Sequence, residues 1–341
     1  MLFNRHKSTI VLAILTVVAS VYSIFVGVID LRLDRILELD FTQIEVLLVS
    51  RLPRLAAILL TGMALSVAGL IMQSLCMNKF VSPTTGATIS SAQFGILIAL
   101  LFIPESTLVS RAIFAFIFAL IGTSIFVSFI LRAQFKDVVM VPLVGIMFGS
   151  IIAGITSFLA FRFDMTQALQ SWLVGHFSTV LKGNYEIVYL TMPLVIIAFI
   201  FTQYFNLVGM GKDFATNLGV HYKTVLFLGL ALAAALTASV VVVVGAISYI
   251  GLIIPNLVSI YKGDNLRNTL IDTALFGALF VLICDLFARI VIYPYELPID
   301  LIVGIVGSAI FIALIFFKLT GRKHLDLNLG ALFARKAPVK G

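Results

Sequence analysis

Long apolar runs, separated by short polar connections, occupy almost the whole chain. About 20 consecutive apolar residues are enough to cross a bilayer as a helix, so runs of this length predict membrane spans. We expect ten transmembrane helices, at approximately 8–28, 55–76, 87–103, 112–131, 138–161, 187–205, 225–244, 246–261, 270–292 and 299–317. The pattern predicts an all-α membrane protein.

No part of the chain has the composition of a soluble domain, which predicts a single polytopic transmembrane domain over residues 1–320. A longer polar connection, at about 206–223, interrupts it. Residues 321–341 form a basic tail without a recognisable motif.

Basic residues are divided unevenly between the two sides of this topology. With the N-terminus inside, 15 of the 23 lysines and arginines fall on the cytoplasmic side. The positive-inside rule then predicts that both termini are cytoplasmic. The net charge of +7 follows from this topology and the tail. Because the basic residues are spread over many loops, we expect no nucleic-acid partner.

Composition excludes several classes of function. Hydrophobic residues make up 61% of the chain and charged residues 11%, whereas soluble proteins carry about 25% charged residues. The two cysteines lie in apolar runs and the four histidines are scattered, so we expect neither a disulfide framework nor a metal site. A phosphate-binding GxxxxGK[ST] loop is absent, so we expect no ATP, and no other cofactor, on this chain.

The polar connection contains the sequence GMGKDFATNLG at 209–219. Its spacing predicts a short helix bounded by glycines, and small residues would let another protein approach closely. The glycines are equally compatible with helix caps. Ala215 and Leu218 are three residues apart and are expected to share a helix face. The docking candidates are therefore Gly209, Gly211, Ala215, Leu218 and Gly219.

Arginines on the predicted outer side form a second candidate site. Arg51 and Arg54 lie at the outer mouth of the second span, and Arg289 lies near the outer end of the ninth. A guanidinium can dock a partner carboxylate through paired hydrogen bonds. It can also extend to lipid headgroups, and Asp285, four residues before Arg289, could instead pair with it on a helix.

Five positions are candidates for either the transport pathway or helix packing. Gln73 is a polar group within the second span and needs a partner there, most simply an interhelical hydrogen bond. Gly145 and Gly149 in the fifth span, and Gly304 and Gly307 in the tenth, would allow helices to approach closely. The same small residues are compatible with lining a pathway.

Eight short motifs, in order along nearly the whole chain, carry a resemblance to a known family. They are RLPR at 51–54, GLIMQ at 69–73, NKFVSP at 78–83, WLVG at 172–175, GMGKDFATNLG at 209–219, GLIIPN at 251–256, GDN at 263–265 and ELPI at 296–299. The chain resembles the iron-siderophore and cobalamin permeases of type II ABC importers, and among them those for catecholate siderophores. It departs from the family pattern at Asn256, Ser259, Asp300, 265–267 and 307–309.

The resemblance implies a type II ABC importer permease fold, in which the second to fifth and seventh to tenth spans are inverted halves. It implies a pathway between two permease subunits, with a heterodimer favoured and a homodimer possible. Two cytoplasmic ATPases would bind ATP and Mg²⁺ and contact the 206–223 loop. An extracytoplasmic binding protein would dock at Arg51 and Arg54, with Arg289 as a weaker candidate, and deliver a ferric siderophore to the outer mouth. The location implied is a bacterial cytoplasmic membrane.

Other functions are weighed against this one. A haem or cobalamin ABC permease remains open, because apolar pathway walls do not identify a bulky ligand. An ion-coupled secondary transporter needs acidic groups within the membrane. Apart from Asp300 at the very start of the tenth span, only Asp272 and Asp285 lie inside the predicted spans. A membrane-embedded enzyme finds no support, because no constellation of intramembrane His, Glu or paired Asp is present.

Overall fold

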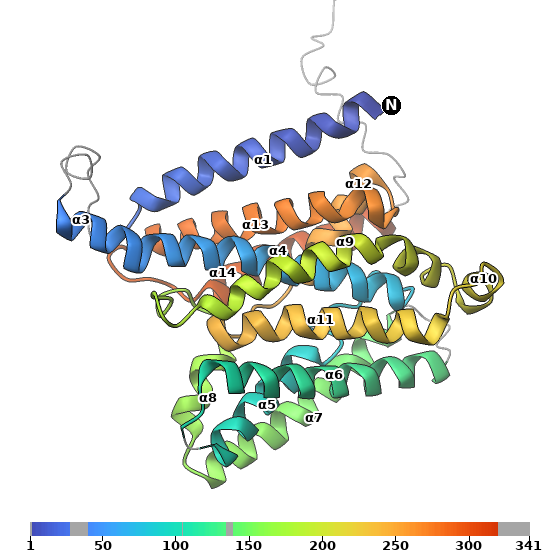
Figure 1. Cartoon of the computed structure of the whole chain (residues 1–341), viewed down its shortest axis with the longest axis horizontal. Coiled ribbons are helices and arrows are strands. Elements are labelled where there is room, and N and C mark those ends of the chain that lie inside the picture. Colours follow the sequence, from blue (N-terminus) through green and yellow to red (C-terminus); the bar gives the residue numbers. More distant parts are fainter. Residues whose placement is uncertain (1, 28–39, 104, 134–138, 320–341) are drawn as a thin grey trace, which may run out of the picture.

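The computed structural model describes residues 2–27, 40–103, 105–133 and 139–319, and every regular element in those ranges is a helix (Figure 1). The basic tail predicted for 321–341 lies outside the described residues. In chain order the elements are α1 (Leu2–Phe25), α3 (Phe41–Val46), the π-helical turn η1 (Leu47–Arg51), α4 (Leu52–Leu75), α5 (Thr88–Phe102), α6 (Leu108–Ala133), α7 (Met140–Arg162), α8 (Thr166–Leu173), the 3₁₀ turn η2 (Glu186–Leu190), α9 (Thr191–Val208), α10 (Lys212–Asn217), α11 (Tyr222–Val244), α12 (Ile250–Lys262), α13 (Leu266–Ile290) and α14 (Ile299–Leu319).

Each of the ten predicted spans corresponds to a helix in the described part of the chain. Among the described residues, seven helical segments are long and apolar enough to cross a membrane, and α5, α12 and α14 contain shorter apolar helices. The second span begins earlier than predicted, because α3, η1 and α4 form one continuous helix over Phe41–Leu75. The all-α membrane fold is thus confirmed.

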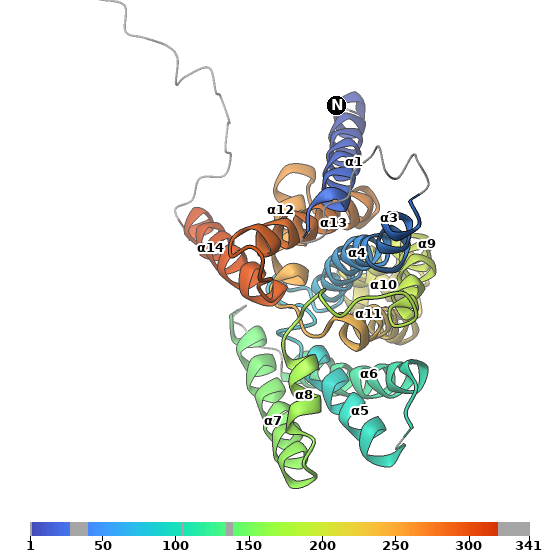
Figure 2. The ribbon, with the colours of Figure 1, turned by 90° about the vertical axis from the view of Figure 1, so that its left-hand side faces the viewer.

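The centre of the bundle is formed by α4, α11 and α13, whereas α1 lies at its edge (Figure 2). In the apolar window of α4, 78% of the residues are buried, against 11% in α1. Glycines let α4 touch its neighbours at backbone distance. A Cβ atom at Gly69 would lie 1.9 Å from the carbonyl oxygen of Gly251 in α12, and one at Gly62 would lie 2.3 Å from that of Gly277 in α13. Helix contacts in membranes rely on such close packing of small residues.

Two sets of four helices repeat the same order of lengths. Helices α4 to α7 have 24, 15, 26 and 23 residues, and α11 to α14 have 23, 13, 25 and 21. The short second helix follows a left-handed, non-glycine residue in both sets, Ala87 with φ 60° and Tyr249 with φ 66°. This correspondence supports the predicted repeat, and the halves run in opposite directions because they begin at the second and seventh spans.

Candidate functional site

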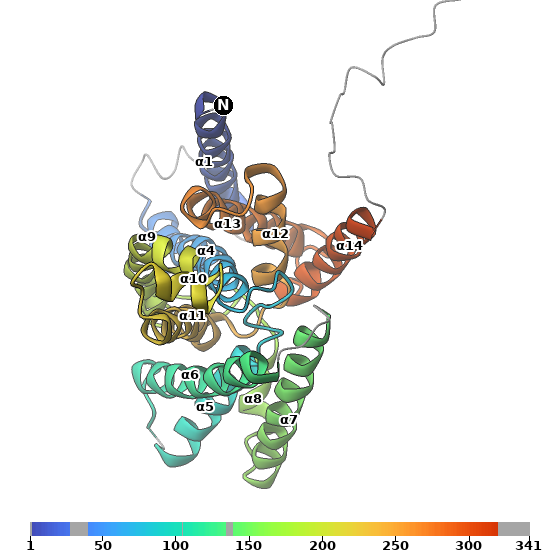
Figure 3. The same ribbon diagram turned by 90° about the vertical axis from the view of Figure 1, so that its right-hand side faces the viewer.

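The two candidate sites lie at opposite ends of the bundle (Figure 1). We call them the arginine end, which carries Arg51, Arg54 and Arg289, and the α10 end, which also holds the N-terminus of α1. Seen from the α10 end, α10 projects in front of α9 and α11 (Figure 3). This separation is what two different docking partners would require.

The RLPR motif owes its local geometry to Pro53. Proline has no N–H, so an α-helix cannot be regular around it. The preceding residues form the π-helical turn η1, in which the Leu52 N–H donates to the carbonyl oxygen of Leu47. The carbonyl oxygen of Val49, four residues before Pro53, accepts a hydrogen bond from the Lys182 N–H at 3.0 Å. Isolated π turns often mark functional positions, and this one ends at Arg51.

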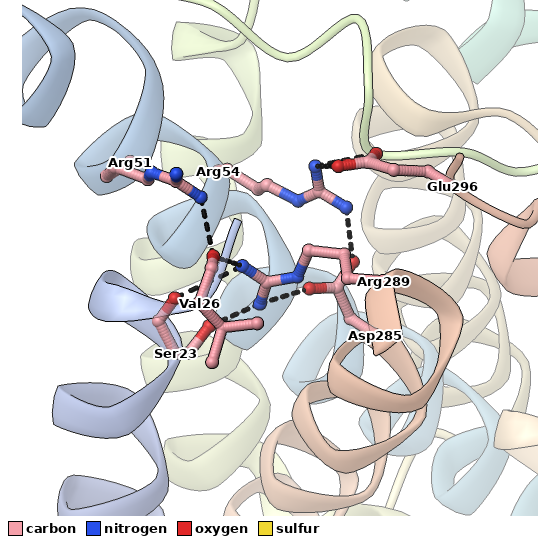
Figure 4. Close-up of polar contacts among 7 residues, drawn as sticks. All are labelled: Ser23, Val26, Arg51, Arg54, Asp285, Arg289 and Glu296. Carbon is pink, nitrogen blue, oxygen red and sulfur yellow. Dashed lines mark hydrogen bonds and ion pairs between the residues drawn. The ribbon is translucent and has the colours of Figure 1, made fainter. Parts of the chain in front are cut away.

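An ion cluster links α4, α13 and the α13–α14 connection (Figure 4). Arg54 Nη2 donates to Asp285 Oδ1 at 2.9 Å, and Arg54 Nη1 contacts both carboxylate oxygens of Glu296 at 2.8 Å. Arg289 Nη2 lies 2.6 Å from Asp285 Oδ2. Asp285, whose side chain is 1% exposed, is therefore shared by two arginines.

The same arginines bind the C-terminal end of α1. Arg51 Nη1 donates to the Val26 carbonyl oxygen at 2.5 Å, and Arg289 Nη1 donates to the same oxygen at 2.8 Å. Arg289 also donates to the carbonyl oxygen of Ser23 at 3.1 Å and to its hydroxyl at 2.5 Å. The last carbonyls of a helix lack partners within it and carry partial negative charge, so arginines stabilise them.

Exposure separates the three arginines predicted to dock a partner. Arg289 is 2% exposed at its side chain, and its predicted alternative, a pair with Asp285 one helical turn away, is confirmed. We therefore assign Arg289 to holding α1 and Asp285, and its docking role stays a prediction. Arg54 is 12% exposed and Arg51 is half-buried. Three arginines against two carboxylates, Asp285 and Glu296, leave one positive charge in excess.

The polar connection forms the helix α10, and its glycines are caps. Gly211 precedes α10 with φ 110°, and Gly219 follows it with φ 77°, conformations that favour glycine. The Gly219 N–H donates to the carbonyl oxygen of Thr216, and the Val220 N–H donates to that of Ala215, both at 3.0 Å. These two bonds form a Schellman motif. The cap interpretation is confirmed, and it does not exclude a docking role.

Ala215 does not lie where the sequence predicted. Its side chain is fully buried against its own chain, whereas Leu218 is 57% exposed, so the two do not share a face. The reason is that α10 ends at Asn217 and Leu218 has already left the helical conformation. The exposed apolar side chains around α10 are Met210, Phe214 and Leu218, at 59%, 47% and 57%. Sequence reasoning missed Met210 and Phe214 as surface residues.

Gly209 packs against the end of α4. A Cβ atom there would lie 2.6 Å from the Ser74 hydroxyl oxygen, and that hydroxyl donates to the Phe205 carbonyl oxygen at 3.0 Å. Gly209 therefore fixes where the α10 loop leaves α9. Its role in this structure is packing within one chain.

The predicted pathway or packing residues divide clearly. Gln73 Nε2 donates to the carbonyl oxygens of Gly251 and Leu252 at 3.2 and 3.3 Å, so the predicted interhelical bond is confirmed. A Cβ atom at Gly145 would lie 1.7 Å from the Thr85 carbonyl oxygen, which makes that glycine a packing residue.

The remaining three glycines lie at progressively more open positions. A Cβ atom at Gly307 would lie 2.9 Å from that of Tyr249, and one at Gly149 would lie 3.3 Å from the Ser90 hydroxyl oxygen. A Cβ atom at Gly304 would have no neighbour within 4 Å among the described residues, so no contact in that part of the chain requires a glycine there. Pathway roles for these residues remain predictions.

Comparison with known proteins decides the family. The FecCD transport family matches residues 15–317. This chain belongs to the FecCD transport family. Such FecCD permeases work in ABC systems with partner subunits, and the chain is a multi-pass membrane protein of this kind.

Several FecCD relatives are similar over most of their length. The petrobactin import system permease protein YclN of Bacillus subtilis is 46% identical over 92% of this chain and 98% of its own. The ferric-anguibactin transport system permease protein FatD of Vibrio anguillarum is 38% identical over 81% of this chain and 87% of its own. A solved metal-chelate type ABC transporter in an inward-facing conformation matches with a TM-score of 0.76 at 26% identity, over 91% of this chain and 99% of that one.

Proposed function

We propose that this FecCD permease is the membrane subunit of an ATP-driven importer and moves a ferric siderophore into the cytoplasm by alternating access. The observation that supports the proposal is the placement of the two candidate docking sites at opposite ends of one permease fold. The arginine end has one excess positive charge and suits an acidic partner. The α10 end presents three exposed apolar side chains around a short capped helix.

The siderophore class rests on relatives and on sequence motifs. The permeases from Bacillus subtilis and Vibrio anguillarum are named for petrobactin and ferric-anguibactin transport. The segments NKFVSPTT at 78–85 and GLIIPNLVSIYKGDNL at 251–266 favour a catecholate type. We infer that the cargo is a ferric siderophore of this type, delivered by an extracytoplasmic binding protein.

A second permease subunit would complete the pathway. Helices α7 and α14 lie on the same side of the bundle (Figures 2 and 3). Their large apolar side chains are exposed, among them Ile151 at 62%, Phe158 at 66%, Ile305 at 62% and Ile312 at 66%. We propose that these faces meet the second subunit or line the pathway, with a heterodimer favoured.

The ATPases are proposed to be two separate cytoplasmic subunits that bind ATP and Mg²⁺, with no cofactor on this chain. The N-terminus of α1 and α10 lie at the same end of the bundle (Figure 1). This arrangement supports a cytoplasmic α10 and agrees with the predicted cytoplasmic N-terminus. The location proposed is the bacterial cytoplasmic membrane.

Both acids predicted within the membrane are already paired, which weighs against ion coupling. Asp285 contacts Arg54 and Arg289. Asp272 forms an ion pair with Lys262 and accepts a hydrogen bond from Thr9 at 2.6 Å. A carboxylate that carries protons or sodium ions across a membrane must be free to exchange them.

The docking surface is tested by reversing the charge of Arg51. Arg51→Glu changes the net charge of the cluster from +1 to −1 and should weaken the stimulation of ATP hydrolysis by the importer's binding protein. Losing a rim charge changes docking by about 0.2–1 kcal/mol, and a buried partner costs about 2–5 kcal/mol. We expect an intermediate loss because Arg51 is half-buried. The measurement is ATP hydrolysis by the assembled complex against binding-protein concentration.

Arg162→Glu is the matched control. Arg162 is exposed, ends α7 and is predicted on the same side of the membrane. The Arg162→Glu substitution should shift the dependence of ATP hydrolysis on binding-protein concentration less than Arg51→Glu does. Equal stimulation of the wild type and of Arg51→Glu, with the complex still assembled, would remove Arg51 from the docking surface.

A further inference from the structure

Glu296 differs from the other acid of the ion cluster in its exposure and in the backbone that carries it. Its side chain is 28% exposed, whereas that of Asp285 is 1% exposed. Glu296 lies in the non-helical connection between α13 and α14, and Asp285 lies within α13. Glu296 can therefore move without displacing a helix, and Asp285 cannot.

Glu296 and Asp285 bind different terminal nitrogens of the Arg54 guanidinium. Both carboxylate oxygens of Glu296 lie 2.8 Å from Arg54 Nη1, while Nη2 is bound by Asp285. Arg54 and Glu296 also line a cavity of about 210 Å³, together with Asp285, His176 and Pro298. Within this cavity, the Glu296 carboxylate contacts Arg54 Nη1, and Asp285 contacts Nη2 (Figure 4).

We propose that Glu296 is an internal competitor for Arg54, which a carboxylate of the docking partner displaces. The inference rests on the proposed docking function and adds a specificity-determining residue to it. Docking then exchanges one carboxylate for another on the same guanidinium. A partner must supply an acidic side chain at this position, because a neutral one would leave Arg54 with Glu296.

The relative strengths of the two pairs make Glu296 the exchangeable one. Breaking a buried pair such as Arg54–Asp285 leaves an uncompensated charge and is strongly unfavourable. A partly exposed pair such as Arg54–Glu296 is weaker, because water replaces the lost partner. Asp285 therefore keeps Arg54 in place during the exchange. Such an arrangement discriminates by rejecting wrong partners as well as by attracting the right one.

The test measures how tightly the importer's binding protein binds to the assembled complex in nanodiscs. Glu296→Gln keeps the shape of the side chain and removes its charge. It is expected to tighten binding by about two- to five-fold, the range for a partly exposed ion pair. Glu45→Gln is the matched control, because Glu45 is exposed in α3, which lies at the same end of the bundle (Figure 1), and no described contact joins Glu45 to the cluster. The affinity of the Glu45→Gln complex for the binding protein should change less than that of the Glu296→Gln complex.

A second measurement reports on Arg54 without any partner. Phenylglyoxal modifies accessible guanidinium groups, and mass spectrometry gives the rate at each arginine. Modification of Arg54 should be faster in Glu296→Gln than in the wild type, with buried Arg289 as the slow internal reference. This measurement separates the two proposals, because it is independent of docking. Should the wild-type complex fail to bind the binding protein, docking at this surface fails while Arg54 reactivity still reports whether Glu296 covers it.

Two results would overturn the inference. One is unchanged reactivity of Arg54 in Glu296→Gln, because Glu296 then does not cover it. The other is faster modification of Arg54 together with unchanged or weaker binding, because Glu296 would then position Arg54 for the partner instead of competing with it.

Discussion

Asp285→Asn is expected to lower the free energy of unfolding by about 3–5 kcal/mol, the usual effect of removing one partner from a buried ion pair. Of the two carboxylates in the cluster, Asp285 is the one that contacts two guanidinium groups, those of Arg54 and Arg289. A neutral asparagine would leave the positive charges of both guanidinium groups without the Asp285 carboxylate. Water cannot replace it at Arg289, whose side chain is only 2% exposed. The measurement is the fraction of detergent-solubilised permease that stays monodisperse after heating.

Asp264→Asn is the control for that substitution. Asp264 pairs with Lys79 at 2.5 Å, but the two side chains are 69% and 44% exposed. An exposed pair contributes about 0.2–1 kcal/mol. Equal losses of stability in the two variants would show that burial of Asp285 does not carry the effect, and the assignment of the cluster as a structural centre would be wrong.

Phe214→Asp and Leu218→Asp are expected to release the ATPase subunits. Both side chains are exposed apolar groups at α10, and we propose that the ATPase covers them. A carboxylate desolvated at the centre of an interface reduces affinity by at least about 2 kcal/mol, or about 30-fold. The measurement is co-purification of the ATPase, together with ATP hydrolysis stimulated by the loaded binding protein.

Lys212→Ala and Lys223→Ala test whether any change near α10 has the same result. Both lysines are exposed and flank the apolar surface, so their loss should be tolerated much better. Ala215→Trp is a poor probe, because Ala215 is fully buried in its own chain and a large side chain there would distort the loop itself. Wild-type co-purification with Phe214→Asp and Leu218→Asp would reduce α10 to a capped connector.

Hydropathy predicted the spans because in a membrane a helix is nearly the only way to satisfy the backbone. The prediction failed at the start of the second span, where the helix extends back to Phe41. Polar and charged residues such as Gln43, Glu45 and Arg51 break the apolar run there. A helix that continues beyond the apolar run leaves no signal in hydropathy.

The partners of the arginines could be predicted only when they were local. The Asp285–Arg289 pair is four residues apart and follows from helix geometry. The Arg54–Glu296 and Arg54–Asp285 contacts span 242 and 231 residues, and those to Ser23 and Val26 depend on where α1 ends. ELPI was visible as a motif, yet no local rule connects its glutamate to RLPR.

One departure from the family pattern has a clear structural role. Asp300 stands where the family usually has glycine, and its Oδ1 accepts a hydrogen bond from the Ser248 N–H at 2.8 Å. Ser248 lies in the short connection between α11 and α12. The side chain thus ties the start of α14 to the link before the short helix α12. Sequence alone showed the departure without its partner.

Transport in reconstituted vesicles tests the central claim most directly. The permease, with its partner permease, ATPases and binding protein, is placed in proteoliposomes with a ferric catecholate siderophore on the binding-protein side. We predict accumulation that requires ATP and the ATPase subunits, with no uptake by the permease alone under a proton or sodium gradient. Gradient-driven accumulation by vesicles that lack the ATPase would contradict the account and establish a secondary transporter.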